Sequence, residues 1–147
     1  MKKLLTLALL LTIGAVQAQR SDTETFSVTM TAGTSMGAEL EYKGAIAYIR
    51  PSLQFAKLST DIYSGIGINF NEDADNLLRY YVGGRLGVTI RENTNAMSGY
   101  ESGIDIRIAK GLILGIRVSN DYKSDYTFYP DGKKWNQEFV LKFGAEW

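Results

Sequence analysis

The 147-residue chain contains no cysteine, no histidine and only two prolines. Without cysteine it has no disulfide, no thiolate metal site, no thiol nucleophile and no lipidated N-terminal cysteine. Without histidine it lacks both the commonest metal ligand and the commonest general base. Basic and acidic residues number 16 each, so no excess of positive charge indicates a nucleic-acid partner. What remains has the length of a single domain and enough apolar residues to exclude a disordered chain.

Residues 1–18 have the pattern of a secretory signal peptide. Two N-terminal lysines precede an apolar run over residues 4–16, and Val16 and Ala18 suit the −3 and −1 positions of a signal peptidase site. The run has 13 residues, whereas a transmembrane helix needs about 20. We therefore expect cleavage after Ala18, export from a bacterial cytoplasm, and one domain over residues 19–147 without a transmembrane helix.

Apolar and polar side chains alternate along most of the remaining chain. In residues 78–91 the even positions carry no charge, whereas the odd positions include three arginines. A helix would scatter both sets around its axis, but a strand places each set on its own face. The alternation predicts eight strands, over residues 25–32, 36–43, 45–55, 62–70, 78–91, 101–108, 112–121 and 138–147. The segments between them, including residues 92–99, are expected to form turns and loops.

Eight alternating strands can close into a barrel with either face inside. A soluble ligand-binding barrel has an apolar interior, whereas an outer-membrane barrel turns its apolar residues to the lipid and its polar residues to the lumen. The polar face here is rich in glycine, which adds nothing to a solvent-exposed strand but makes room in a narrow eight-stranded lumen. We therefore predict an all-β fold, an eight-stranded antiparallel up-and-down transmembrane β-barrel with a polar lumen filled by side chains.

The polar face also carries charges of both signs. In a lumen they would have to pair, because an unpaired buried charge is very costly. The predicted lumen charge network consists of Glu39, Arg50, Arg79, Arg85, Glu101, Asp105, Arg107, Arg117 and Glu138.

The two tryptophans, Trp135 and Trp147, share the apolar face and lie 12 residues apart. At about 3.3 Å per residue this spacing spans roughly 40 Å along a strand. A strand tilt of about 45° reduces it to roughly 28 Å vertically, close to the apolar band of about 25 Å in a membrane barrel. We therefore expect the two indoles to lie at the two membrane interfaces.

An export signal, eight alternating strands and the closing segment Phe143-Gly144-Ala145-Glu146-Trp147 resemble the small bacterial outer-membrane barrels. OmpX and the transmembrane part of OmpA are the most similar in shape, and the resemblance covers residues 23–147. It implies a Gram-negative outer membrane, contact with lipid and lipopolysaccharide, and insertion by the barrel assembly machinery. In that family the terminal aromatic strand is the signal for assembly, and by resemblance Phe143, Ala145 and Trp147 would have that role. Family members usually have long extracellular loops, whereas the first one expected here, residues 33–35, is very short.

Little in the sequence indicates catalysis. The histidine-dependent mechanisms of outer-membrane barrel enzymes are excluded, so we expect neither enzymatic activity nor a cofactor. The acidic segment 71–76 lacks the glycine and the distal glutamate of a calcium loop and is expected to be a solvated periplasmic turn. The long loop 121–135 contains aromatic residues and lysines that could contact lipopolysaccharide or a surface partner, and its aromatic residues also suit an interfacial girdle.

Two functions follow from the two barrels. The first is a small outer-membrane protein with a structural or surface-interaction role, because eight strands leave no open channel for a porin. The alternative is a soluble periplasmic barrel that binds an apolar ligand. Its interior would be lined by Leu86, Val88, Ile106, Leu114 and Phe143.

Overall fold

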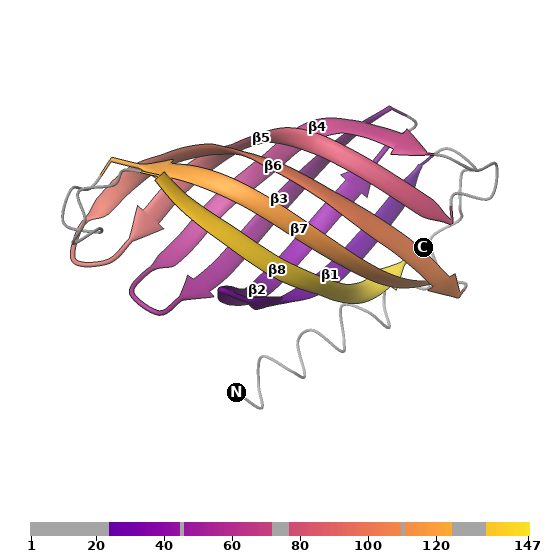
Figure 1. Cartoon of the computed structure of the whole chain (residues 1–147), viewed down its shortest axis with the longest axis horizontal. Helices are drawn as coiled ribbons and strands as arrows, with labels where there is room; N and C mark the ends of the chain where they lie inside the picture. Colours follow the sequence, from indigo (N-terminus) through magenta and orange to yellow (C-terminus); the bar gives the residue numbers. More distant parts are fainter. Residues whose placement is uncertain (1–23, 45, 72–76, 110, 125–134) are drawn as a thin grey trace.

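The computed structural model describes residues 24–44, 46–71, 77–109, 111–124 and 135–147 (Figure 1). The strands are β1 (Thr25–Gly33), β2 (Ser35–Lys43), β3 (Ala47–Ala56), β4 (Thr60–Asn71), β5 (Leu78–Ile90), β6 (Thr94–Ala109), β7 (Leu112–Lys123) and β8 (Trp135–Glu146). Each pairs antiparallel with the next, and β1 also pairs with β8, so the sheet closes into a barrel. The predicted all-β, eight-stranded antiparallel barrel is confirmed.

No helix in these ranges is long and apolar enough to cross a membrane. The predicted signal peptide lies outside the described residues, as does the acidic segment after Asn71.

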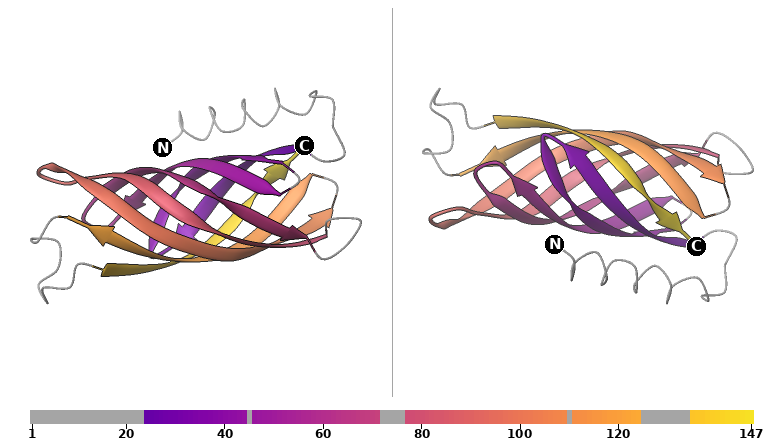
Figure 2. Two further views of the ribbon diagram at one scale, coloured as in Figure 1. Left: turned by 90° about the horizontal axis from the view of Figure 1, so that it is seen from above. Right: turned by 90° about the horizontal axis from the view of Figure 1, so that it is seen from below.

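The strands run obliquely around the barrel (Figures 1 and 2). The start of β1 and the end of β8 lie side by side at one end of it. At that end, which we call the terminal end, Phe26 and Trp147 exchange backbone hydrogen bonds of 2.9 and 3.0 Å. The opposite end, which we call the far end, carries the turns that follow β1, β3 and β5. The turn between β1 and β2 is a single residue, Thr34, in agreement with the very short first loop that the sequence predicts.

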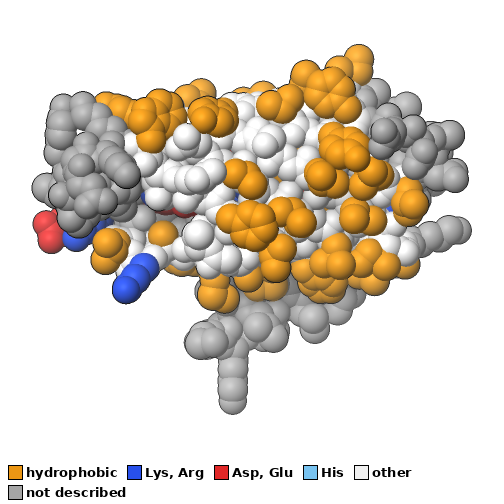
Figure 3. All heavy atoms as spheres, viewed as in Figure 1, with side chains coloured by type: hydrophobic (Ala, Val, Ile, Leu, Met, Phe, Trp, Pro, Cys, Tyr) orange, Lys and Arg blue, Asp and Glu red, His pale blue; other side chains and the backbone are white. Residues whose placement is uncertain are grey.

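Inward and outward side chains alternate along most of each strand, although Val28 of β1 is buried between two inward residues. On β5, the side chain of Arg85 is fully buried, whereas the adjacent Leu86 is 65% exposed. Many exposed apolar side chains project from the outer surface, and those on one face are seen in Figure 3. The interior contains many charged and hydroxyl side chains, together with tyrosines such as Tyr48, Tyr63 and Tyr81.

This arrangement is the reverse of a soluble barrel. The apolar lining expected for a soluble ligand-binding barrel is on the outside: Leu86, Ile106, Leu114 and Phe143 are exposed and Val88 is half-exposed. That assignment of an apolar interior is therefore wrong. On each strand, these apolar residues alternate with the buried polar or charged residues and so point to the opposite side of the sheet.

One predicted loop is part of a strand. Residues 94–99 belong to β6, which the sequence prediction begins only at residue 101. Their outward side chains include Ala96 and Ser98, and the apolar Met97 points inward, so hydrophobicity does not alternate here. Pairing with β5 imposes the strand instead, in an unbroken ladder from Leu78 opposite Ile106 to Ile90 opposite Thr94. The predicted loop 121–135 is also shortened, because its two ends belong to β7 and β8.

The lumen glycines make room for particular neighbours. A Cβ atom on Gly65 would lie 2.5 Å from the Glu101 carboxylate, and one on Gly103 would collide with the ring of Tyr81. Gly111 is needed for a different reason, since its φ of 85° in the turn after β6 disfavours other residues. These contacts explain why glycine is frequent on the polar face of the strands.

Candidate functional site

The charged interior of the barrel is the region where polar groups of this chain are concentrated. Among the described residues, ion pairs join eight carboxylates to eight cations. The carboxylates are Glu39, Glu41, Asp61, Glu101, Asp105, Asp121, Glu138 and Glu146, and the cations are Lys43, Arg50, Arg79, Arg85, Arg107, Arg117, Lys123 and Lys142. The paired charges therefore balance, as the cost of burying an isolated charge requires.

Two arginines hold the middle of the lumen. Arg50 of β3 donates to Glu41 of β2 at 2.9 Å and to Glu101 of β6, whose carboxylate also accepts the Tyr48 hydroxyl at 2.7 Å. Arg117 of β7 pairs with Glu39 of β2 across the barrel. The Arg50–Glu101 and Arg117–Glu39 hydrogen bonds connect strands that the sheet ladder does not join directly, β3 to β6 and β7 to β2.

Tyr63 belongs to the same central layer. Its hydroxyl accepts a hydrogen bond of 2.9 Å from Arg117, and the guanidinium of Arg85 lies 3.8 Å from its ring centroid. Further toward the terminal end, the Tyr81 ring has Arg50, Arg79 and Lys142 within 4.7–4.9 Å of its centroid. Such cation–π contacts are stronger in a desolvated interior than at a surface.

At the terminal end, Asp105 pairs with Arg79 and accepts hydrogen bonds of 3.0 Å from Lys142. Glu146 pairs with Arg107 and, at 3.7 Å, with Lys43. The space left among these side chains is about 10 Å³, about the minimum that one water molecule needs.

At the far end, Arg85 pairs with Asp121 at 2.7 Å and with Glu138 at 3.4 Å. Asp61 accepts the Thr89 hydroxyl at 2.5 Å and pairs with Lys123 at 2.7 Å. Charged layers therefore follow one another along the lumen from end to end.

The structure brings together all nine residues of the predicted network. Eight of them are buried, and the side chain of the ninth, Arg107, is 14% exposed near the terminal end. The sequence prediction did not include the other seven paired residues, which are Lys43, Glu41, Asp61, Asp121, Lys123, Lys142 and Glu146. Glu41 lies on the same face of β2 as the predicted Glu39. Lys142 and Glu146 lie on the same face of β8 as the predicted Glu138. Asp61 and Lys123 lie just outside the predicted strands 62–70 and 112–121, so the alternation of the two strand faces could not assign them to the lumen.

Within the described ranges, no group of three histidine, cysteine, aspartate or glutamate side chains could hold a metal ion.

No family model matches the chain, and a search of the curated proteins finds no match. Among solved structures, one described as "De novo design of transmembrane beta-barrels" matches with a TM-score of 0.56. The match covers 88% of this chain and 98% of the designed one, at 12% sequence identity. The chain has a transmembrane-like β-barrel fold. Because the identity is so low, the likeness concerns the fold alone.

Aromatic side chains lie near both ends of this transmembrane-like barrel. Near the far end, the Trp135 ring contacts Tyr122 and Tyr100, with centroid separations of 5.6 and 6.2 Å. At the terminal end, the Trp147 ring lies 5.3 Å from that of Phe26. The spacing of the two tryptophans along β8 is therefore also a spacing along the barrel.

The three residues that resemble an assembly signal lie at the end of β8. Phe143 is 57% exposed on the outer face, and Ala145 and Trp147 follow on the same face with partial exposure. Phe143 pairs with Met30 of β1 and with Leu114 of β7.

Proposed function

We propose that this chain is a small protein of a Gram-negative outer membrane, with a structural or surface-interaction role and a lumen closed to solutes. One observation carries the proposal: most of the large side chains on the outer face of the barrel are apolar and exposed, and the barrel buries paired charges in layers inside. A hydrocarbon environment stabilises such an exterior, whereas water would not.

The same observation disfavours the soluble alternative. A barrel that binds an apolar ligand needs an apolar cavity, yet the centre of this lumen holds Arg50, Glu101 and Arg117 with little or no solvent exposure. A porin role is also disfavoured, because charged side chains bridge the lumen layer after layer.

Export and assembly complete the proposal. The N-terminal pattern supports a cleaved signal peptide, and the outward aromatic residues at the end of β8 support insertion by the barrel assembly machinery. The expected lipid partners are outer-membrane phospholipid and lipopolysaccharide. A surface partner at the connection within residues 121–135 is part of the proposal, and residues 125–134 of it lie outside the described structure.

We propose no catalytic activity. In the lumen, ion pairing with arginine or lysine engages the carboxylates that a general acid or nucleophile would require. The interior is therefore better suited to cross-linking strands than to chemistry.

Fractionation of the full-length, tagged protein expressed in a Gram-negative host tests the proposal. We expect the protein in the outer-membrane fraction, soluble only with detergent, and with an electrophoretic mobility that changes on boiling. A detergent-free monomer in the periplasm that saturably binds a fluorescent fatty acid would overturn the proposal in favour of the soluble barrel.

A further inference from the structure

The apolar outer surface is interrupted on one side. Across β4–β7, around the middle of the strands and toward the far end, several small or polar side chains face outward beside apolar ones such as Leu86 and Ile66. We call this the polar patch; it consists of Ser64, Gly84, Ser98, Tyr100, Ser102 and Asn120. On the strands opposite, outward positions such as Met36, Leu53 and Phe55 are apolar.

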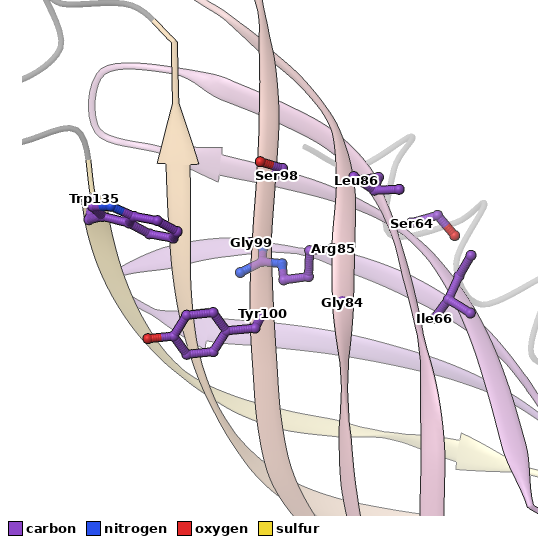
Figure 4. Close-up of a pocket in the computed structure, with 9 residues that line it drawn as sticks. All are labelled: Ser64, Ile66, Gly84, Arg85, Leu86, Ser98, Gly99, Tyr100 and Trp135. Atoms are coloured by element: carbon purple, nitrogen blue, oxygen red, sulfur yellow. The ribbon is translucent and has the colours of Figure 1, made fainter.

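A hollow lies within the polar patch. It has a volume of about 370 Å³ and lies over Gly84, with Tyr100 and Trp135 on one side and Leu86 and Ser64 on the other (Figure 4). A Cβ atom on Gly84 would meet only the carbonyl oxygen of Gly99, at 3.8 Å. Unlike the lumen glycines, Gly84 is therefore not required by the packing of its own chain, and what it provides is open space on the outside.

The serine hydroxyls of the patch, those of Ser64, Ser98 and Ser102, have no hydrogen-bond partner among the described residues. Asn120 donates from Nδ2 to the Tyr100 hydroxyl at 3.0 Å, which leaves that hydroxyl's own hydrogen to donate outward. Hydrocarbon chains cannot accept or donate hydrogen bonds, so in a membrane these groups are stabilised by a polar partner.

We propose that two copies of this chain associate side by side in the membrane through the polar patch, with Tyr100 of each copy filling the hollow over Gly84 of the other. This inference rests on the proposed membrane location. Gly84 and Tyr100 are direct cross-strand partners, so the hollow and the projecting ring are neighbours. A two-fold axis between them places each opposite its counterpart in the second copy, as an isologous interface requires.

The chemistry of the patch suits self-association. None of its residues is charged, so two identical surfaces do not repel each other. Hydroxyl groups both donate and accept hydrogen bonds, so the serines and Tyr100 of one copy can pair with those of the other. A lipid acyl chain would fill the hollow but would offer no hydrogen bond to any of the serine hydroxyls.

Because the chain contains no cysteine, single cysteines report on proximity without background. Ser98→Cys and Ser102→Cys are introduced separately, with Ala38→Cys as the matched control. Ala38 is exposed on β2, which lies four strands from β6 in either direction. After mild oxidation of membranes, we expect a disulfide-linked product of twice the monomer mass for Ser98→Cys or Ser102→Cys, and none for Ala38→Cys.

A second substitution tests the hollow. Adding Gly84→Leu to the Ser102→Cys variant should lower the cross-linked fraction about tenfold or more, which corresponds to about 1.4 kcal/mol or more of association free energy. Adding Ala38→Leu should leave it unchanged. Heat-modifiable mobility is measured for every variant and shows that the barrel itself has folded.

Three results would overturn the dimer. They are a folded, heat-modifiable protein that cross-links no more than the Ala38→Cys control, a cross-linked product of any other mass, and a folded monomer from which Gly84→Leu releases a bound lipid. A protein that is absent from the membrane fraction would instead overturn the proposed function.

Discussion

Adjacent residues of one strand experience opposite environments in this barrel. Arg85 is enclosed by Asp121 and Glu138, whereas Leu86 faces outward beside the hollow. The effect of a substitution therefore depends more on whether the position faces the lumen or the outside than on the type of residue.

A cation on the outer face should destabilise the barrel according to its depth. Leu141 lies six residues from both Trp135 and Trp147, halfway between the expected interfaces, and is 53% exposed. Leu141→Arg should cost about 2–4 kcal/mol of unfolding free energy, and Gln137→Arg, on the same face of β8 near Trp135, about 0–1 kcal/mol. Denaturant titration in lipid vesicles measures both. Equal costs at the two depths would contradict the membrane orientation.

The buried Glu39–Arg117 ion pair should show a large coupling free energy in a double-mutant cycle of unfolding. Glu39→Gln leaves Arg117 without its carboxylate, and Arg117→Met leaves Glu39 without that cation, so each single substitution should cost about 3–5 kcal/mol. The double variant should cost less than the sum of the two, by about 0.5–3 kcal/mol, because no charge is then left facing its lost partner. Strictly additive costs in a denaturation cycle would show that this pair contributes nothing as a pair.

A methyl group should be tolerated outside and harmful inside. In Gly103→Ala the new Cβ atom collides with the Tyr81 ring, so we expect a loss of about 1–3 kcal/mol. Gly84→Ala enters open space, and its effect should be within about 1 kcal/mol of neutral or stabilising. Thermal or denaturant unfolding of the two variants in the same detergent compares them. Similar losses in both would argue against a lumen filled by side chains.

At the scale of the strand, the sequence is informative where the two faces differ. Residues 78–90 form β5 almost as predicted, because arginines alternate with apolar side chains along them. The first six residues of β6 escape prediction because serine, alanine and glycine carry little contrast, and their pairing partner on β5 determines their conformation. The alternation of polar and apolar positions predicts which charged side chains face the lumen, but it does not predict which of them form ion pairs with one another. Partners such as Arg117 and Glu39 are brought together by barrel closure, over a sequence separation of 78 residues.

The last strand should matter for assembly more than for final stability. Deleting Trp147 removes its contact with Phe26 and the final pair of backbone hydrogen bonds. By resemblance to outer-membrane barrels, we expect normal export but unassembled protein in the periplasm, whereas Trp147→Phe should assemble. Quantitative fractionation with a protease-protection assay distinguishes the two. Normal membrane levels of the deletion variant would show that assembly does not depend on this residue.

At the scale of the whole molecule, the described strands form a closed barrel whose lumen contains carboxylates and cations in equal number. Paired side chains occupy each level of the lumen from Glu146 at the terminal end to Asp61 at the far end. Barrier properties therefore follow from the interior, whereas insertion and association depend on the exterior. The two sets of properties should be separable by mutation.

Reconstituted protein should show little or no steady conductance in a planar bilayer. The reason is that ion pairs bridge the lumen at successive levels, so a permeating ion would have to displace them. Protein-free bilayers and bilayers with an open porin provide the two reference levels. A large, stable conductance would contradict the closed lumen while leaving the membrane location intact.

The pairing of β1 with β8, which closes the barrel, affects the order in which the strands can pair during folding. Its ladder joins residues such as Ser27 and Glu146, which lie at opposite ends of the described chain. Hydrogen bonds between β1 and β8 can form only after every intervening residue has emerged from the ribosome. The hairpins from β1–β2 to β7–β8 need no such wait, since each has its partner strand next to it in sequence. Closure is thus a single late event of high contact order. Until it occurs, the nascent protein presents two unpaired sheet edges, both of which can pair with other chains.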